Sequence, residues 1–427
     1  MIQASYLGRA GRHLLAQRDI MALNNLVDPK SKMDWYTAAT ILAKQRAQGV
    51  PAAQIQPIPY FENLFPDVTA MRDGIIAGES LSATKAATLL PTTFTATQLI
   101  YQDAAKIDGG DWTTAQLDVE GTQAAFPFMF YQGQYGALTA FSSIGNSNYN
   151  AFTFSVRQRY RTMLSLDFNY TYSHSLDDAS GLQSSGAYGS AFILNPIQQG
   201  ASYANSDFDT RHQININSVL QIPVGTGKTF LSNVPRVVNG IIGGWSLSNI
   251  FRWNTGLPTG SVNDNGVFDD ARWATNREVQ SNAFQTAPFG VCPTRPTVGT
   301  PKLFGCNTTF AFQHFRNPYP GETGQRNIFR IPGFIDLDMG LGKTFNLSGI
   351  SSRLEGHTLA FRWEVFNVTN TQRMGNFDGS RSGFGIPLDP NLTTPPTNFS
   401  NFTSIQPLTP GVAGGYRVMQ FSLRYAF

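Results

Sequence analysis

Hydrophobic and polar residues alternate with a period of two in several separate segments of the chain. At the end of the sequence, apolar Phe421 and Leu423 alternate with polar Ser422 and Arg424. Successive side chains of a β-strand point to opposite faces, so this pattern predicts strands with one apolar and one polar face. Eight segments follow the rule: 1–8, 150–160, 163–173, 212–222, 244–253, 334–345, 358–367 and 416–427.

The connections between these segments alternate between long and short. The links at 160–161, 223–243 and 346–354 are short or moderate, whereas four links are long and rich in Gly, Pro, Asn and Ser. The long links are residues 9–148, 175–210, 257–332 and 371–413. Short periplasmic turns and longer external loops are typical of outer-membrane barrels, whose tilted strands need about ten residues to cross. We therefore expect an all-β fold, an antiparallel transmembrane β-barrel of which about eight strands are visible.

Composition supports contact with an apolar medium. Charged residues make up 14% of the chain and aromatic residues 12%, whereas charged residues are about 25% of an average soluble protein. No apolar run approaches the roughly 20 residues that a membrane-spanning helix needs, so strands must cross any membrane. The net charge is +3 with scattered basic residues, and this distribution predicts no nucleic-acid partner.

The sequence Gly-Thr-Gly-Lys-Thr at residues 225–229 invites comparison with a phosphate-binding loop. That motif needs a glycine five positions before Gly227, and Ile222 stands there. It also needs a following helix, which Pro235 and Gly240 argue against. We expect a tight turn with Lys228 in solvent, and no cofactor.

The remaining chemical candidates favour structural roles. The histidines lack metal-ligand spacing, and we expect His212 to be a hydrogen-bonded structural residue. Asp177 and Asp178 are expected to be a solvated acid pair in a loop, and no nucleophile elbow occurs. The sequence thus predicts neither an enzyme nor a metal site. For Cys292 and Cys306 we expect a disulfide, with two unpaired thiols as the alternative.

The alternation also assigns side chains to the two faces of a barrel wall. Aromatic residues with one polar atom settle at the membrane interface, and the candidates for such girdles are Tyr170, Tyr172, Trp245, Trp253, Trp363 and Tyr425. A barrel interior is polar. The expected lumen-lining residues are Arg157, Arg159, Arg252, Arg362, Glu364 and Arg424, with Asp167, Asp336 and Asp338 beside them.

Six strings in a fixed order resemble the Oar-like branch of the TonB-dependent outer-membrane transporters. They are ASYLGRAGRHL, YNAFTFSVRQRY with YTYSHSLDDAS, SDFDTRHQININSVLQIPVGTGK, GGWSLSNIFRWNTGLP, RWEVFNVTN and the terminal FSLRYAF. The resemblance covers nearly the whole chain apart from the loop interiors. It implies uptake of a scarce solute across the outer membrane of a Gram-negative cell, driven by the TonB complex acting through a plug.

The resemblance further implies that the last strand is the signal for the outer-membrane assembly machinery, with Phe421, Leu423, Tyr425 and Phe427 as its apolar anchors. Strand addition at an open edge offers a physical basis for such docking. Members of the family form 22-stranded barrels with a plugged lumen. The family's signal peptide, coupling box, plug and amino-terminal domain are not recognisable in 1–427. We therefore expect residues 1–427 to be the carboxy-terminal part of such a barrel, a fragment that does not transport alone.

Two alternatives from other classes remain open. One is a passive porin or an adhesion-type barrel, whose complete gene would encode no plug or coupling box. The other is a secreted β-sandwich that binds glycans, in which the apolar faces would meet in a core and the chain would stay soluble without detergent.

Overall fold

A computed structural model provides the structure of the chain. It describes residues 1–20, 25–107, 139–161, 163–180, 195–259, 284–293, 302–316, 318–347, 354–371, 399–402 and 416–427, together with Ile193, Thr394 and Pro395. All four predicted long loops, 9–148, 175–210, 257–332 and 371–413, therefore lie partly outside the described residues.

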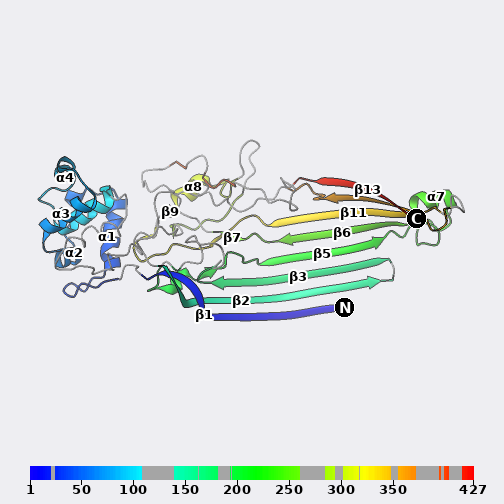
Figure 1. The fold of residues 1–427 in the computed structure, drawn as a ribbon, viewed down its shortest axis with the longest axis horizontal. Helices are drawn as coiled ribbons and strands as arrows, with labels where there is room; N and C mark the ends of the chain where they lie inside the picture. Colours follow the sequence, from blue (N-terminus) through cyan, green and yellow to red (C-terminus); the bar gives the residue numbers. More distant parts are fainter. Residues whose placement is uncertain are drawn as a thin grey trace.

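One large antiparallel sheet dominates the molecule (Figure 1), and its main path runs β1-β2-β3-β5-β6-β11-β12-β13. Each of the eight segments predicted from the two-residue alternation contributes one of these strands, which confirms the antiparallel all-β fold class. β1 and β13 are the two ends of this path, and the short β4 (Ala204–Asn205) pairs with β3 off it. The strands are β1 (Ile2–Asp19), β2 (Thr139–Tyr160), β3 (Leu164–Asp177), β5 (His212–Gln221), β6 (Trp245–Asn254), β11 (Phe334–Asn346), β12 (Thr358–Phe366) and β13 (Val418–Ala426).

The strand register separates the side chains into two faces. Directly paired residues of an antiparallel sheet project from the same face, and one such row joins Phe168, Ile216, Phe251 and Leu337 across four strands. We call this side the apolar face. The neighbouring row, on the opposite side, joins Asn169, Asn215, Arg252 and Asp336. We call that side the polar face.

The two ends of the sheet differ in their connections. The two labelled chain ends, the described connection 222–244 and the strand ends at residues 160, 164, 346 and 358 lie at one end, which we call the turn end (Figure 1). The longer connections lie at the other end, the loop end. The turn between β5 and β6 contains a short helix, α7 (Arg236–Ile242), where sequence analysis expected none. A proline is tolerated where a helix starts, because no hydrogen bond is lost there, and Pro235 is the residue just before α7.

The turn at residues 225–229 is built as the sequence suggested. The glycines Gly225 and Gly227 have positive φ angles of 117° and 73°, which L side chains rarely adopt. The amide of Gly225 donates to the carbonyl of Phe230 at 2.9 Å, and Lys228 is exposed. The segment therefore closes a turn between strands rather than opening a helix.

A helical insert, residues 35–107, lies between β1 and β2 at the loop end (Figure 1). Sequence analysis treated all of 9–148 as loop, but β1 continues to Asp19, β2 begins at Thr139, and side-chain caps at Asp34, Asp67, Ser82 and Thr95 start helices between them. Such caps satisfy free backbone N–H groups at a helix start. The elements are α1 (Trp35–Ala47), η1 (Ala52–Gln54), α2 (Pro59–Leu64), α3 (Val68–Gly78), α4 (Ala83–Leu89), α5 (Ala96–Gln102) and the π-helix η2 (Asp103–Ile107).

The helical insert has its own hydrophobic core. One cluster of fully buried side chains forms this core, and it includes Trp35, Leu42, Tyr60, Phe61 and Met71. The insert also contacts the long β6–β11 connection, since the Thr40 hydroxyl donates to the Pro320 carbonyl at 3.3 Å. No helix among the described residues is long and apolar enough to cross a membrane.

The β6–β11 connection builds a second, smaller core. A cluster of buried aromatic residues includes Phe304, Phe312, Phe315, Phe329 and Phe399. Because Phe399 belongs to the β12–β13 connection, that connection contributes to the same core. Cys292 and Cys306 form a disulfide beside this cluster, with Cα atoms 5.8 Å apart. The local elements are β7 (Pro258–Thr259), β8 (Phe284–Gln285), α8 (Thr308–Gln313), β9 (Phe315–Arg316) and β10 (Phe329–Arg330), with η3 (Gln199–Ser202) in the β3–β5 connection.

Candidate functional site: the polar face and its rim

The charged residues that sequence analysis assigned to a lumen all lie on the polar face. Their register positions share that side of the sheet with Asn169 and Asn215. The set comprises Arg157, Arg159, Arg252, Arg362, Glu364 and Arg424, with Asp167, Asp336 and Asp338. Whether this face lines a lumen stays a prediction.

Opposite charges pair along the polar face. The Arg157 guanidinium lies 3.6 Å from the Asp167 carboxylate, and the Arg362 guanidinium lies 2.6 Å from that of Glu364. Both arginine side chains are well exposed, at 67% and 60%. Exposed pairs of this kind contribute little to stability, so these side chains remain available to solutes.

A hollow of about 340 Å³ lies in the polar face across β3, β5, β6, β11 and β12. Among its lining residues are Asp167, Asn217, Asp338, Arg362 and Glu364. Gly340 forms part of its floor, where a Cβ atom would come 2.6 Å from the Ser248 hydroxyl. The hollow thus offers three carboxylates, one guanidinium and amide groups beside the apolar side chains of Val219, Ile250 and Phe366, so its lining is mixed.

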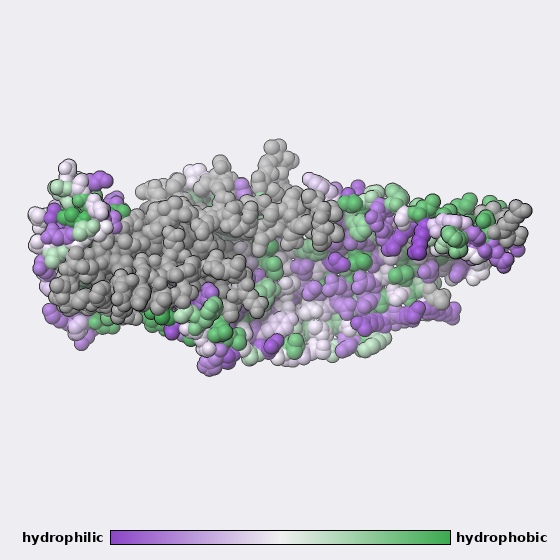
Figure 2. Space-filling model, viewed as in Figure 1, coloured by the Kyte–Doolittle hydropathy of each residue, from purple (hydrophilic) through white to green (hydrophobic). Residues whose placement is uncertain are grey.

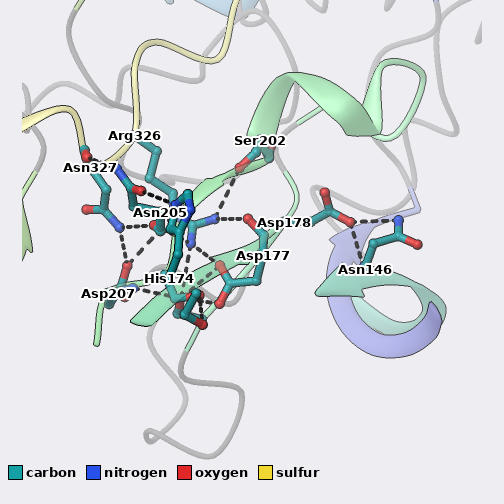
Figure 3. Close-up of polar contacts among 12 residues, drawn as sticks. Asn146, His174, Asp177, Asp178, Ser202, Asn205, Asp207, Arg326 and Asn327 are labelled. Atoms are coloured by element: carbon teal, nitrogen blue, oxygen red, sulfur yellow. Dashed lines mark hydrogen bonds and ion pairs between the residues drawn. The ribbon is translucent and has the colours of Figure 1, made fainter. Parts of the chain in front are cut away.

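At the loop end, Arg326 joins a loop to the end of β3 (Figure 3). Its guanidinium contacts the Asp177 carboxylate and donates to the backbone carbonyls of Ser202 at 3.1 Å and Asn205 at 3.3 Å. The Arg326 and Asp177 side chains are only 11% and 8% exposed. We call this group, with Asn327 and Asp207, the rim cluster.

A second buried charge lies next to the rim cluster. The Asp209 carboxylate is 1% exposed and contacts the guanidinium groups of Arg211, at 3.0 Å, and Arg330. It also accepts a hydrogen bond from the Ser175 amide at 2.6 Å. Because a buried carboxylate is stable only when paired and hydrogen-bonded, these contacts hold the β3–β5 and β6–β11 connections against the strand ends.

The expectation that Asp177 and Asp178 form a solvated pair is wrong. Both residues are buried, at 6% and 3% exposure, and their carboxylates face different partners (Figure 3). Asp177 accepts from Arg326, and Asp178 accepts from the Asn146 backbone amide at 2.7 Å. Among the residues the structure describes, no group of three or more His, Cys, Asp or Glu is placed to hold a metal ion.

Sequence reasoning missed Arg326, Arg330 and Asn205. Arg326 and Asp177 lie 149 positions apart in the chain, so no local pattern links them. The local signal that was present is a pair of arginines, Arg326 and Arg330, four positions apart in the β6–β11 connection.

Aromatic residues gather on the apolar face near both ends of the sheet. Toward the loop end, the His212 ring hydrogen-bonds to the Tyr170 hydroxyl at 2.9 Å and lies against Tyr172 and Trp253, with ring centroids 5.0 and 6.3 Å away. This arrangement matches the structural role expected for His212. The register places all six girdle candidates on the apolar face, and their interfacial role stays a prediction.

The last strand presents its apolar side chains outward. Phe421, Leu423 and Tyr425 of β13 are 67%, 67% and 50% exposed, and Phe427 is 94% exposed. Their role as an assembly signal stays a prediction.

Comparison with known proteins gives a family for this two-faced sheet. Searches of the curated proteins and of the solved structures found no match. A family model described as "Outer membrane beta barrel domain" matches residues 1–420. This places the chain in the outer membrane; that the apolar face meets lipid stays a prediction. The chain therefore belongs to the outer membrane beta barrel domain family.

Proposed function

We propose that the chain forms part of the wall and of the external mouth of an Oar-like TonB-dependent transporter, which takes up a scarce solute. The observation that carries the proposal is the polar face, where a hollow of about 340 Å³ bearing both signs of charge lies behind an apolar outer face. Residues 1–427 act in this proposal as one part of the transporter, together with a plug. The role is transport, and no catalytic step is assigned to any residue.

The two parts of the site have different tasks in this proposal. The polar face guides a polar solute and contacts the plug. Arg362, Glu364 and Asp338 lie on this side of the sheet and supply the charged groups for both contacts. The rim cluster holds the connections around the mouth, since Arg326 and Arg330 each bind both a carboxylate and backbone carbonyls. Energy from the TonB complex reaches the barrel through the plug.

The first test is the reading frame upstream of residue 1 in the source genome. An encoded plug and coupling box support the transporter, whereas a frame without them favours a passive pore or adhesion barrel. The second test deletes the gene and measures uptake of a panel of scarce solutes, with and without the TonB gene. Uptake that needs both genes supports the proposal, and uptake that survives loss of TonB contradicts it.

The proposal also assigns the outer-membrane assembly machinery as a partner of β13. Deleting Phe427 from the full-length protein should lower the amount found in the outer membrane, because an apolar anchor of the docking strand is removed. Arg424→Gln, on the polar face of the same strand, is the matched control and should leave the yield unchanged. Unchanged yield after the Phe427 deletion, measured by quantitative immunoblotting of membrane fractions, would remove this role.

A further inference from the structure

The helix α7 is fastened to the apolar face at the turn end. The Lys343 ammonium donates to the carbonyls of Gly240 at 2.5 Å and Ile241 at 3.1 Å, and the Trp245 indole donates to the Ile241 carbonyl at 2.8 Å. Lys343 and Trp245 are direct partners in the register, on the same side as Leu247 and Leu341. The carboxy-terminal carbonyls of α7 are thus held by two residues of the apolar face.

The outer surface of this turn is apolar. Val237 and Ile241, four positions apart, lie on one side of the helix and are 78% and 67% exposed. Phe230 and Leu231, which precede the helix, are 60% and 59% exposed. We call these four residues the turn patch. In Figure 2, hydrophobic residues are visible at the end of the molecule where α7 lies.

The charges of the same connection are of one sign. Residues 222–244 contain Lys228 and Arg236 and no Asp or Glu, and both basic residues are exposed. Exposed apolar side chains next to basic residues are typical of segments that lie in a membrane interface and attract anionic lipids.

We propose that the turn patch is a membrane-interface anchor that lies among the headgroups of the periplasmic leaflet and binds anionic phospholipid. Three observations carry it: α7 is hydrogen-bonded to Lys343 and Trp245 of the apolar face, the positive charge of the connection is complementary to phosphate headgroups, and the apolar side chains of the patch are exposed. The short turns of outer-membrane barrels face the periplasm, which selects the leaflet. The proposal rests on the outer-membrane location and not on the transported solute.

The test uses a nitroxide at position 241 in the full chain. Because Cys292 and Cys306 pair with each other, the cysteine in Ile241→Cys is a selective labelling site. The labelled chain is folded into vesicles of phosphatidylethanolamine and phosphatidylglycerol. The matched control is Gln221→Cys, an exposed residue at the same end but on the polar face.

Collisions with oxygen and with a water-soluble nickel chelate measure the surroundings of each label. The ratio of oxygen to chelate collisions at 241 should be several-fold higher than the ratio at 221, because an interfacial label is partly shielded from water. A label at 241 that meets the chelate as readily as the label at 221 would overturn the proposal. Dipolar broadening of the spectrum at 241 that disappears on mixing with unlabelled chain would show that the patch contacts a second copy of the chain. This result would also overturn the proposal.

A label at Leu337→Cys, on the apolar face of β11 away from the turn end, separates failure of this inference from failure of insertion. Lipid contact at 337 with water contact at 241 contradicts the anchor alone, whereas water contact at 337 contradicts the barrel wall itself. The headgroup preference is tested with Lys228→Gln combined with Arg236→Gln. This variant should reduce the preference of the label at 241 for spin-labelled phosphatidylglycerol over phosphatidylcholine several-fold, and an unchanged preference would contradict anionic lipid binding.

Discussion

The sheet and the helical insert use the same kinds of side chain in opposite ways. In the insert, Trp35, Tyr60 and Phe61 are fully buried in a common core. In the sheet, Tyr6 and Phe421 are 71% and 67% exposed. Because apolar side chains avoid water, the insert suits water around it, whereas the apolar face of the sheet suits hydrocarbon. Whether large aromatic side chains point inward or outward therefore indicates the medium around each region.

Phe61→Ala tests the inward-facing core and should have the largest effect. Phe61 is fully buried and its ring lies 5.2 Å from that of Tyr60, so the variant should destabilise the insert by about 3–5 kcal/mol. Hydrogen exchange in detergent micelles should rise across residues 35–107 and stay unchanged in β5 and β6. Lys85→Ala, at an exposed position of α4, is the control. Equal loss of protection in the sheet would mean that the two regions unfold as one.

Arg326→Ala tests how firmly the connections are held to the sheet. Removing one partner of a buried ion pair leaves the Asp177 carboxylate unpaired, at a cost of about 3–5 kcal/mol. Arg157→Ala provides the comparison, because the Arg157 and Asp167 side chains are 67% and 38% exposed and an exposed pair contributes about 0–1 kcal/mol. Urea unfolding of the chain in micelles would measure both, and equal losses would contradict a special role for the rim cluster.

Trp363→Arg tests the outward-facing side of the sheet. The Trp363 ring stacks on that of Phe421, with centroids 5.8 Å apart, on the apolar face. If Trp363 lies near the bilayer midplane, the arginine should cost about 2–4 kcal/mol, falling to about 0–1 kcal/mol if it lies at the interface, whereas Glu364→Arg on the polar face should cost much less. The measurement is reversible folding into vesicles, and equal costs would contradict the assignment of the two faces.

Lowering the pH should destabilise the helical insert more than the sheet, and this is the smallest of the expected effects. Burial disfavours ionisation of Asp28, beside the insert, but hydrogen bonds from Ser31 and Asn63 outweigh it and hold its pKa well below the usual range. An unfolded Asp has a pKa of about 3.9. The stabilisation is therefore present above about pH 4 and is lost as the pH falls toward the folded-state pKa.

Asp28→Asn should remove this acid sensitivity. Hydrogen exchange of residues 25–64, followed from pH 7 to pH 3, would show a smaller loss of protection in the variant than in the wild type. The strands should change equally in both proteins. An identical pH dependence in wild type and variant would exclude Asp28 as its source.

The strands were predictable because their signal is local. Alternation such as that in β12 needs only neighbouring residues, and it assigned Trp363 and Glu364 to the opposite faces that the register gives them. The helices of the insert were missed because only a period of two was sought, although Asp34 and Ser82 are capping residues in the sequence. The rim cluster depends on partners such as Asn327 and Asn205, 122 positions apart, and such pairs are fixed by the packing of the connections.

The position of the helical insert has a consequence for how the barrel reaches its final state. Residues 35–107 lie between the two strands of the hairpin made by β1 and β2, so a hairpin that inserts as one unit with its loop end leading must carry them across the bilayer ahead of both strands. Their core gains its folding free energy only once the segment is back in water on the far side. A folded body at the tip then acts as a latch, because the hairpin cannot slide back without unfolding Trp35 and its neighbours.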